Sequence, residues 1–136
     1  MPWFGFIHPA LALFTLFYGL RIGQTSLTKL ADWDFPLRVM RARTLRYFLL
    51  TVANLILGFV FQIVLAAQGR PVRLLGHLPL AIAVVLLTLF ADLATFGRQK
   101  PGELPRMIRW HPILVIASLA LILTMGFTGL LKLFRL

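Results

Sequence analysis

Four long segments of this chain contain no charged side chain, and they restrict its fold more than any other feature. They are Met1–Leu20, Tyr47–Gly69, Leu74–Ala91 and Trp110–Leu131. Each is close to the length that an α-helix needs to cross the hydrocarbon core of a bilayer, about 20 residues. Because the segments are continuously apolar and do not alternate, they predict helices and not the strands of a membrane barrel. The fold class expected is all-α, with four membrane-spanning helices.

Composition agrees with a membrane protein. Of the 136 residues, 60% are hydrophobic and 13% are charged, and the mean hydropathy is +0.89. A soluble domain of this size needs a polar exterior that such a composition cannot supply. We expect a single domain, residues 1–136, folded as an integral membrane four-helix bundle. The predicted spans are about 4–22, 45–67, 74–96 and 110–134.

The segments outside the spans carry two further expectations. The longest, 23–44, mixes apolar and basic residues, so we expect it to lie along the headgroups as a short interfacial helix broken at Pro36. The N-terminus lacks the basic region and cleavage site of a signal peptide, so the first apolar segment is expected to be retained.

The formal charge of +10 is distributed unevenly between the two membrane faces. The connections between the first two and the last two spans emerge on one face with ten basic residues, and the other face has four. The positive-inside rule therefore predicts cytoplasmic connections and both termini on the non-cytoplasmic side of a bacterial inner or thylakoid-type membrane. Anionic headgroups are sufficient partners for these charges, and nucleic acid is not needed.

Several kinds of chemistry are missing from the sequence. There is no cysteine, which excludes disulfides, iron–sulfur clusters and covalent c-type haem attachment. No carboxylate pair, nucleophile triad or phosphate loop is present, so no hydrolytic or transferase motif is found. If the protein has an oxidoreductase role, we expect it to be that of an electron-transfer component.

Polar and small residues recur at helical spacing, which predicts the faces that point into the bundle. His8 aligns with Thr15, and Asn54 aligns with Gly58 and Gln62. On the third span His77 aligns with Val84 and Ala91, with Ala81 and Thr88 alongside. On the fourth span the row is His111, Ser118, Met125 and Lys132.

The three histidines are the candidate cofactor ligands. His8 and His77 lie near the outer ends of two different spans, the arrangement that bis-imidazole ligation of b-type haem requires. Arg70 and Arg73 just precede His77 and could pair with haem propionates. The residues fit equally a simpler interpretation, in which the imidazoles hydrogen-bond only to loops or water at the interface.

Four short motifs carry a family resemblance: His8-Pro9-Ala10, Gly76-His77-Leu78, Arg109-Trp110-His111 and Gly126-Phe127-Thr128-Gly129. Together they resemble a family of short four-helix membrane proteins of photosynthetic bacteria, itself similar to the cytochrome b561 superfamily of transmembrane electron carriers. The resemblance covers nearly the whole chain. It implies two histidine pairs, one from the first and third spans and one from the second and fourth.

The chain departs from that pattern at the second span. The family has a histidine there after a basic residue, whereas this chain reads Leu45-Arg46-Tyr47, with Arg46 at the ligand position. A guanidinium stays protonated and cannot bind iron. We therefore expect the His111 site to be lost, or to hold a five-coordinate pigment. Asp92, the one acid inside a span, is predicted to form an ion pair with Arg46 in the vacated site; pairing with another arginine or with headgroups stays open.

Two functions follow as expectations. The first is a b-type haem protein that transfers electrons at the outer face through His8 and His77. The alternative is an accessory subunit of a larger membrane complex, such as a photosynthetic one, that binds chlorophyll-type pigment or no cofactor. In either case we expect other membrane protein subunits as partners. A channel or transporter is disfavoured, because no broken-helix repeat is present.

Overall fold

The computed structural model of the chain describes residues 6–31, 35–69, 77–96 and 104–134. Within them the chain forms four α-helices, with a short 3₁₀ helix directly before the last. Their bounds are α1 Ile7–Ala31, α2 Leu37–Ala67, α3 Leu78–Leu93, η2 Arg106–Trp110 and α4 His111–Phe134.

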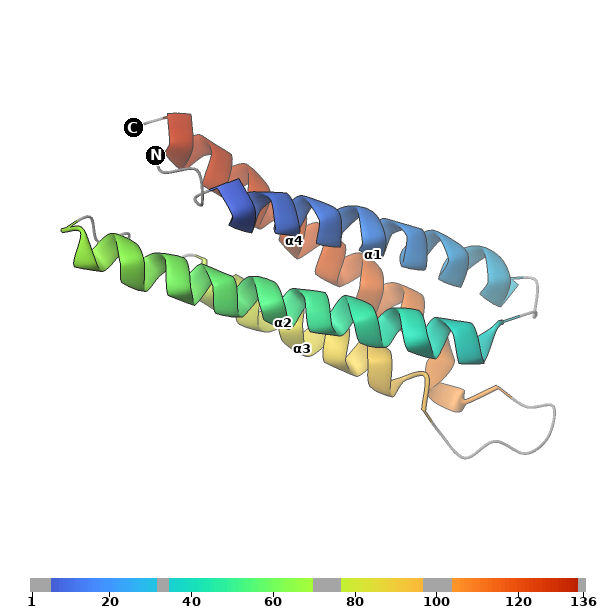
Figure 1. Cartoon of the computed structure of the whole chain (residues 1–136). Helices are drawn as coiled ribbons and strands as arrows, with labels where there is room; N and C mark the ends of the chain where they lie inside the picture. The colour runs from blue at the N-terminus through green and yellow to red at the C-terminus, as the bar shows by residue number, and fades with distance from the viewer. Residues whose placement is uncertain (1–5, 32–34, 70–76, 97–103, 135–136) are drawn as a thin grey trace.

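The four helices form one antiparallel bundle. Helix α1 packs against α2 and α4, and α3 also packs against α2 and α4, so each helix has two neighbours. Figure 1 shows both chain termini at one end of the bundle, and the α1–α2 and α3–α4 connections at the other. The prediction of an all-α four-helix bundle is confirmed.

Two helical segments of the described chain, Leu37–Ala67 and Arg106–Gly129, are long and apolar enough to cross a membrane. Helix α3 is apolar but shorter, with 16 residues. The structure thus places a helix at each predicted span, and length and composition mark two of them as candidates for spanning.

The expectation for residues 23–44 is wrong. Helix α1 continues to Ala31 and α2 begins at Leu37, so most of this segment extends two bundle helices. The break at Pro36 is confirmed, because this proline is the N-cap of α2 and the amide of Met40 donates to its carbonyl oxygen at 2.9 Å. The helix continues for two reasons: the segment Gly23–Ala31 contains no proline, and its side chains, such as Ser26, are buried against α4. The lower hydropathy of this segment therefore does not end the helix.

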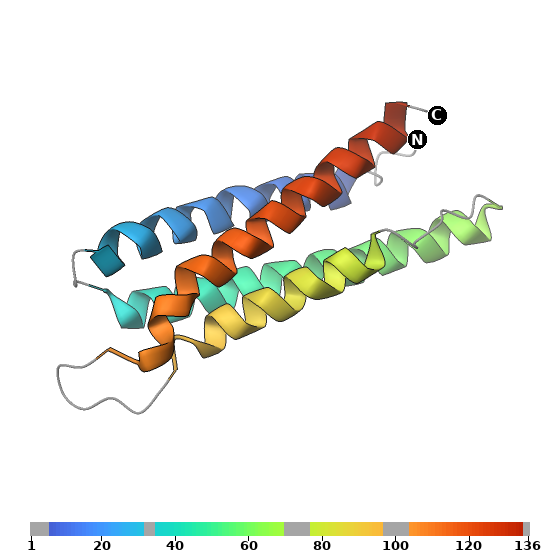
Figure 2. The ribbon, with the colours of Figure 1, turned by 180° about the vertical axis from the view of Figure 1, so that it is seen from behind.

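The buried core occupies one half of the bundle, which we call the closed end because it contains the α1–α2 and α3–α4 connections. Among its largest buried side chains are Ile22, Met40, Tyr47 and Val115. The other half, which we call the open end, contains no buried residue in the described ranges 6–14, 52–69, 77–83 and 123–129. In both ribbon views the C-terminal ends of α2 and α4 diverge toward it (Figures 1 and 2). Tertiary packing is therefore concentrated away from the termini.

The predicted inward rows are buried where they cross the closed end. Thr15, Val84, Thr88, Ala91, His111 and Ser118 are all buried. The open-end members of the same rows that the structure describes, His8, His77 and Met125, are partly exposed. Helical spacing thus identified the correct faces. The difference in burial between the closed and open ends arises from the packing of the whole bundle.

Candidate functional site

His111 is fully buried at the closed end, where it joins three helices. The Ser26 hydroxyl of α1 lies 2.8 Å from its Nδ1, and the Thr44 hydroxyl of α2 lies 2.9 Å from its Nε2. The ring of Phe35 meets the imidazole edge-on, with centroids 6.0 Å apart and an interplanar angle of 75°. The first residue of α4 is thereby fixed to both helices of the opposite hairpin.

The neighbouring hydrogen bonds assign the tautomer of His111. Thr44 donates its one hydroxyl proton to the Met40 carbonyl at 2.8 Å, so its oxygen accepts from the Nε2–H of His111. Nδ1 is then the acceptor of the Ser26 hydroxyl. Both ring nitrogens are thus engaged by hydroxyl groups. In this arrangement His111 has a structural role, which agrees with loss of the second site, and the alternative of a five-coordinate pigment stays a prediction.

His8 and His77 both lie at the open end. His8 lies in the first turn of α1 and His77 is the N-cap residue of α3. Nδ1 of His8 is buried and has no hydrogen-bond partner among the described residues. The structure thus places the two predicted ligands at the same end of the bundle, and their pairing stays a prediction.

Gly58 of α2 forms one wall beside His8. A Cβ at this position would lie 3.4 Å from Cε1 and 3.9 Å from Nε2 of the imidazole. Since glycine has no side chain, the ring of His8 lies directly against the α2 backbone. Arg70 and Arg73, the predicted propionate partners, lie outside the described residues.

The predicted Arg46–Asp92 pair is not formed in the described chain. Arg46 is exposed, and the arginine whose charge acts on the buried Asp92 is Arg41. The guanidinium of Arg41 donates to the Thr95 carbonyl at 2.7 Å and lies 4.2 Å from the centroid of the Phe96 ring. Arg41 therefore caps the C-terminal end of α3, where the helix dipole and free carbonyl groups favour a cation.

Above His111, three more interhelical hydrogen bonds form what we call the polar ladder. They are Tyr47–Ser118 at 2.9 Å, Thr51–Thr88 at 2.9 Å and Asn54–Thr15 at 2.8 Å. The α2 members belong to the series Thr44, Tyr47, Thr51, Asn54 and Gly58, which advances by intervals of three and four residues and so forms one helix face. Sequence reasoning missed Thr44 and Ser26, the two hydroxyl partners of His111. The α2 series was the signal for Thr44, and no such series marks Ser26.

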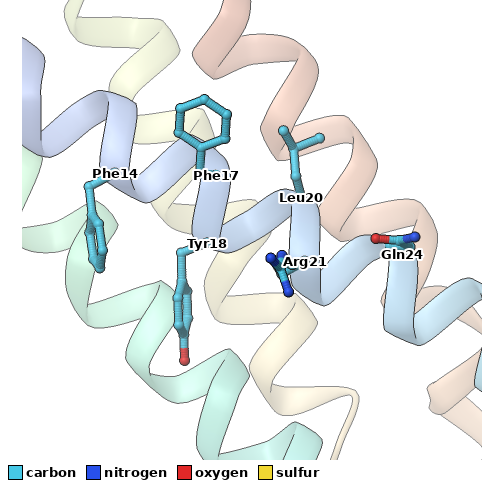
Figure 3. A pocket seen from close by; sticks show the side chains of 6 residues that line it. All are labelled: Phe14, Phe17, Tyr18, Leu20, Arg21 and Gln24. Carbon is cyan, nitrogen blue, oxygen red and sulfur yellow. The ribbon is translucent and has the colours of Figure 1, made fainter.

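Two open grooves of the described surface lie away from the histidines. The first, of about 430 Å³, follows the outside of α1; Figure 3 shows Phe14 and Tyr18 on one side of that helix, and Phe17 and Leu20 on the other. The second, of about 390 Å³, lies between α3 and the η2–α4 segment.

Metal coordination by clustered side chains is not supported, since the described residues contain no group of three or more His, Cys, Asp or Glu side chains. No family model, curated protein or solved structure matches the chain. The family resemblance stays a prediction.

Proposed function

We propose that this protein is an integral membrane bundle that holds b-type haem between His8 and His77 and transfers electrons at the non-cytoplasmic face. Membrane insertion is supported by exposed apolar surface. In the most apolar 18-residue stretch of α2, only 6% of the residues are buried within the protein. A core helix of a soluble protein would be mostly buried, whereas lipid covers such a surface without cost.

The charge distribution supports the orientation. Described basic residues gather at the closed end, among them Lys29, Arg38, Arg43 and Arg106. By the positive-inside rule this end faces the cytoplasm, and the histidine pair then lies at the opposite face.

The observation that carries the cofactor proposal is the buried Nδ1 of His8, which has no hydrogen-bond partner among the described residues, at the end of the bundle where His77 begins α3. A buried imidazole nitrogen without a partner costs free energy unless a ligand or water completes it. Gly58 lets the ring of His8 lie directly against the α2 backbone, and the open end has no buried residue in its described ranges. His8 and His77, from two different helices, are the residues that would hold the iron of a haem from its two sides.

Haem b would supply one-electron transfer at this site. The chain's own part is to fix two imidazoles on different helices and to exclude water with the apolar walls of α1 and α2. The polar ladder holds α1 and α2 in register, because Asn54 and Thr15 join them two turns of α1 from His8.

A visible spectrum tests the proposal. Protein purified from membranes of a haem-replete host should show a Soret band and a sharp α band on reduction. His8→Ala and His77→Ala should each abolish both bands, whereas His111→Gln, which keeps hydrogen-bonding capacity at the closed end, should retain them. Far-UV circular dichroism shows whether each variant is folded. A folded wild-type protein with no absorbance would refute haem binding, and loss of the bands only in His111→Gln would show that the wrong histidine was chosen.

The alternative, a pigment-binding or scaffolding subunit of a larger membrane complex, is favoured by one observation. A Cβ added at Gly126 or Gly129 of α4 would have no atom within 4 Å, and Phe127 between them is 65% exposed. This stretch of α4 is free to pack against a partner helix. An absorbance band in the red in place of the α band, or co-purification with fixed stoichiometry and no absorbance, would favour the subunit.

A further inference from the structure

The groove between α3 and α4 is apolar throughout its lining. Its walls are Phe90 and Leu93 of α3, the C-cap residue Ala94, Met107 and Trp110 of η2, and Leu114 of α4. Ala94 is buried and forms the floor, whereas Phe90, Leu93, Met107 and Trp110 are each about half exposed. Side chains this large are left at a groove of about 390 Å³ with no other segment of the described chain over them.

The 3₁₀ geometry of η2 places charge next to this groove. Residues three apart share a face in a 3₁₀ helix, so Met107 and Trp110 form one row and Arg106 and Arg109 form the adjacent row. Ile108, on the third face, is buried in the core. Each arginine therefore directly precedes a groove residue in the chain, and both arginines are exposed.

These two arginines have no acidic partner among the described residues. Asp92, the buried acid nearest in sequence to the groove, is under the influence of the Arg41 charge, and Arg41 also donates to the Thr95 carbonyl. The mouth of the groove thus combines two exposed cations with an apolar slot between α3 and α4.

We propose that this groove, which we call the α3–α4 groove, is a binding site for an anionic phospholipid. Its phosphate would lie on Arg106 and Arg109, and one acyl chain would lie along Phe90, Leu93 and Leu114. A free anion would have no use for the apolar slot, and a neutral lipid would have no use for the arginines, so only a molecule with both parts satisfies the site. Trp110 is at the interface depth where tryptophan side chains are enriched. The proposal rests on the membrane location proposed above, but not on haem.

Native mass spectrometry of the protein released from nanodiscs with equal phosphatidylglycerol and phosphatidylcholine tests this site. The wild type should retain phosphatidylglycerol in preference. The double variant Arg106→Gln/Arg109→Gln should lower that preference by roughly thirtyfold, since one basic side chain near an anionic surface contributes about 1 kcal/mol. The matched control Arg38→Gln/Arg43→Gln removes the same charge from exposed positions of α2 and should change the preference little.

A second variant, Leu93→Ser, tests whether the apolar part of the α3–α4 groove contributes to lipid binding. Leu93→Ser shortens a half-exposed lining residue, so the fold should persist while phosphatidylglycerol retention falls and both arginines remain. If Arg106→Gln/Arg109→Gln and Arg38→Gln/Arg43→Gln lowered the phosphatidylglycerol preference equally, the proposal would be overturned in favour of diffuse surface charge. Competition by millimolar inorganic phosphate would overturn it in favour of a simple anion site, and a lipid-free dimer would show that a second copy covers the groove.

Failure of this site and failure of the proposed function are separable. Carbonate extraction of membranes reports whether the protein is integral, and the visible spectrum reports the haem. A membrane-embedded, haem-binding protein without lipid preference would reject the α3–α4 groove alone.

Discussion

Among single residues, His111 determines most of the geometry at the closed end. Its two ring nitrogens bond to hydroxyl groups on two other helices, and its side chain is fully buried. The same residue type at the open end, His8, has an unsatisfied nitrogen. The environment, and not the residue type, therefore separates the structural histidine from the candidate ligand.

Replacing His111 by alanine should destabilise the bundle by about 2–5 kcal/mol. The change leaves a cavity and strands the hydroxyl groups of Ser26 and Thr44 without their partner. Unfolding in detergent, followed by circular dichroism, measures the loss. His111→Gln should lose less, because an amide can still bond to one hydroxyl. Equal stability of the wild type and His111→Ala would contradict the structural role.

Gly19 is required by a close approach between α1 and α2. A Cβ there would lie 2.6 Å from Cζ of the buried Tyr47 ring, so Gly19→Ala forces that ring away from its hydrogen bond to Ser118. We expect a loss of about 1–3 kcal/mol in unfolding free energy. Gly126→Ala is the matched control, since nothing lies within 4 Å of its added Cβ, and it should instead stabilise the helix by about 0.5–1 kcal/mol. The same sign for both variants would contradict the packing described.

At the scale of secondary structure elements, hydropathy located every helix but did not locate all the helix ends. The first span was expected to stop near residue 22, where charged and polar residues begin, yet α1 continues to Ala31. Hydropathy reports where lipid contact ends, whereas a helix ends where backbone hydrogen bonding is interrupted. Pro36 supplies such an interruption, and this boundary was predictable.

Replacing Gln24 by proline tests whether residues 23–31 are part of a helix or form a loop. Gln24 is exposed in the middle of α1, so Gln24→Pro should cost about 3 kcal/mol by removing a helical hydrogen bond and adding a steric clash. If residues 23–31 were a loop, the same change would be tolerated. Gln24→Ala, with unchanged or slightly higher thermal stability, is the control.

The candidate site was predictable only in part, for a related reason. The placement of His8 and His77 at one end follows from topology, because antiparallel helices bring the start of the first and the start of the third span together there. The hydroxyl partners of His111 do not follow, because the rotation of each helix about its axis is set by packing across the bundle. The choice of Arg46 for Asp92 had the same weakness, since Arg41 lies on the face of α2 that meets α3.

The whole molecule is asymmetric along the bundle axis. Buried side chains, the polar ladder and the arginines described above lie toward the closed end, whereas His8 and His77 lie at the open end. The C-terminal ends of α2 and α4 also diverge at the open end (Figure 2). Helix α2 has 31 residues, about 46 Å at 1.5 Å per residue, which exceeds a hydrocarbon core of about 30 Å. Its first turns, with Arg38, Arg41 and Arg43, would then project beyond the apolar layer on the closed side.

This asymmetry gives a prediction for orientation that the chain is well suited to test, because it contains no cysteine. Arg43→Cys at the closed end and Gln68→Cys at the open end each introduce one exposed thiol. If the closed end faces the cytoplasm, a membrane-impermeant maleimide added to intact spheroplasts should label Gln68→Cys and leave Arg43→Cys unlabelled until the membrane is permeabilised. The reverse pattern would place the histidine pair on the cytoplasmic side. Labelling of both in intact spheroplasts would show that the bundle does not span the membrane in one orientation.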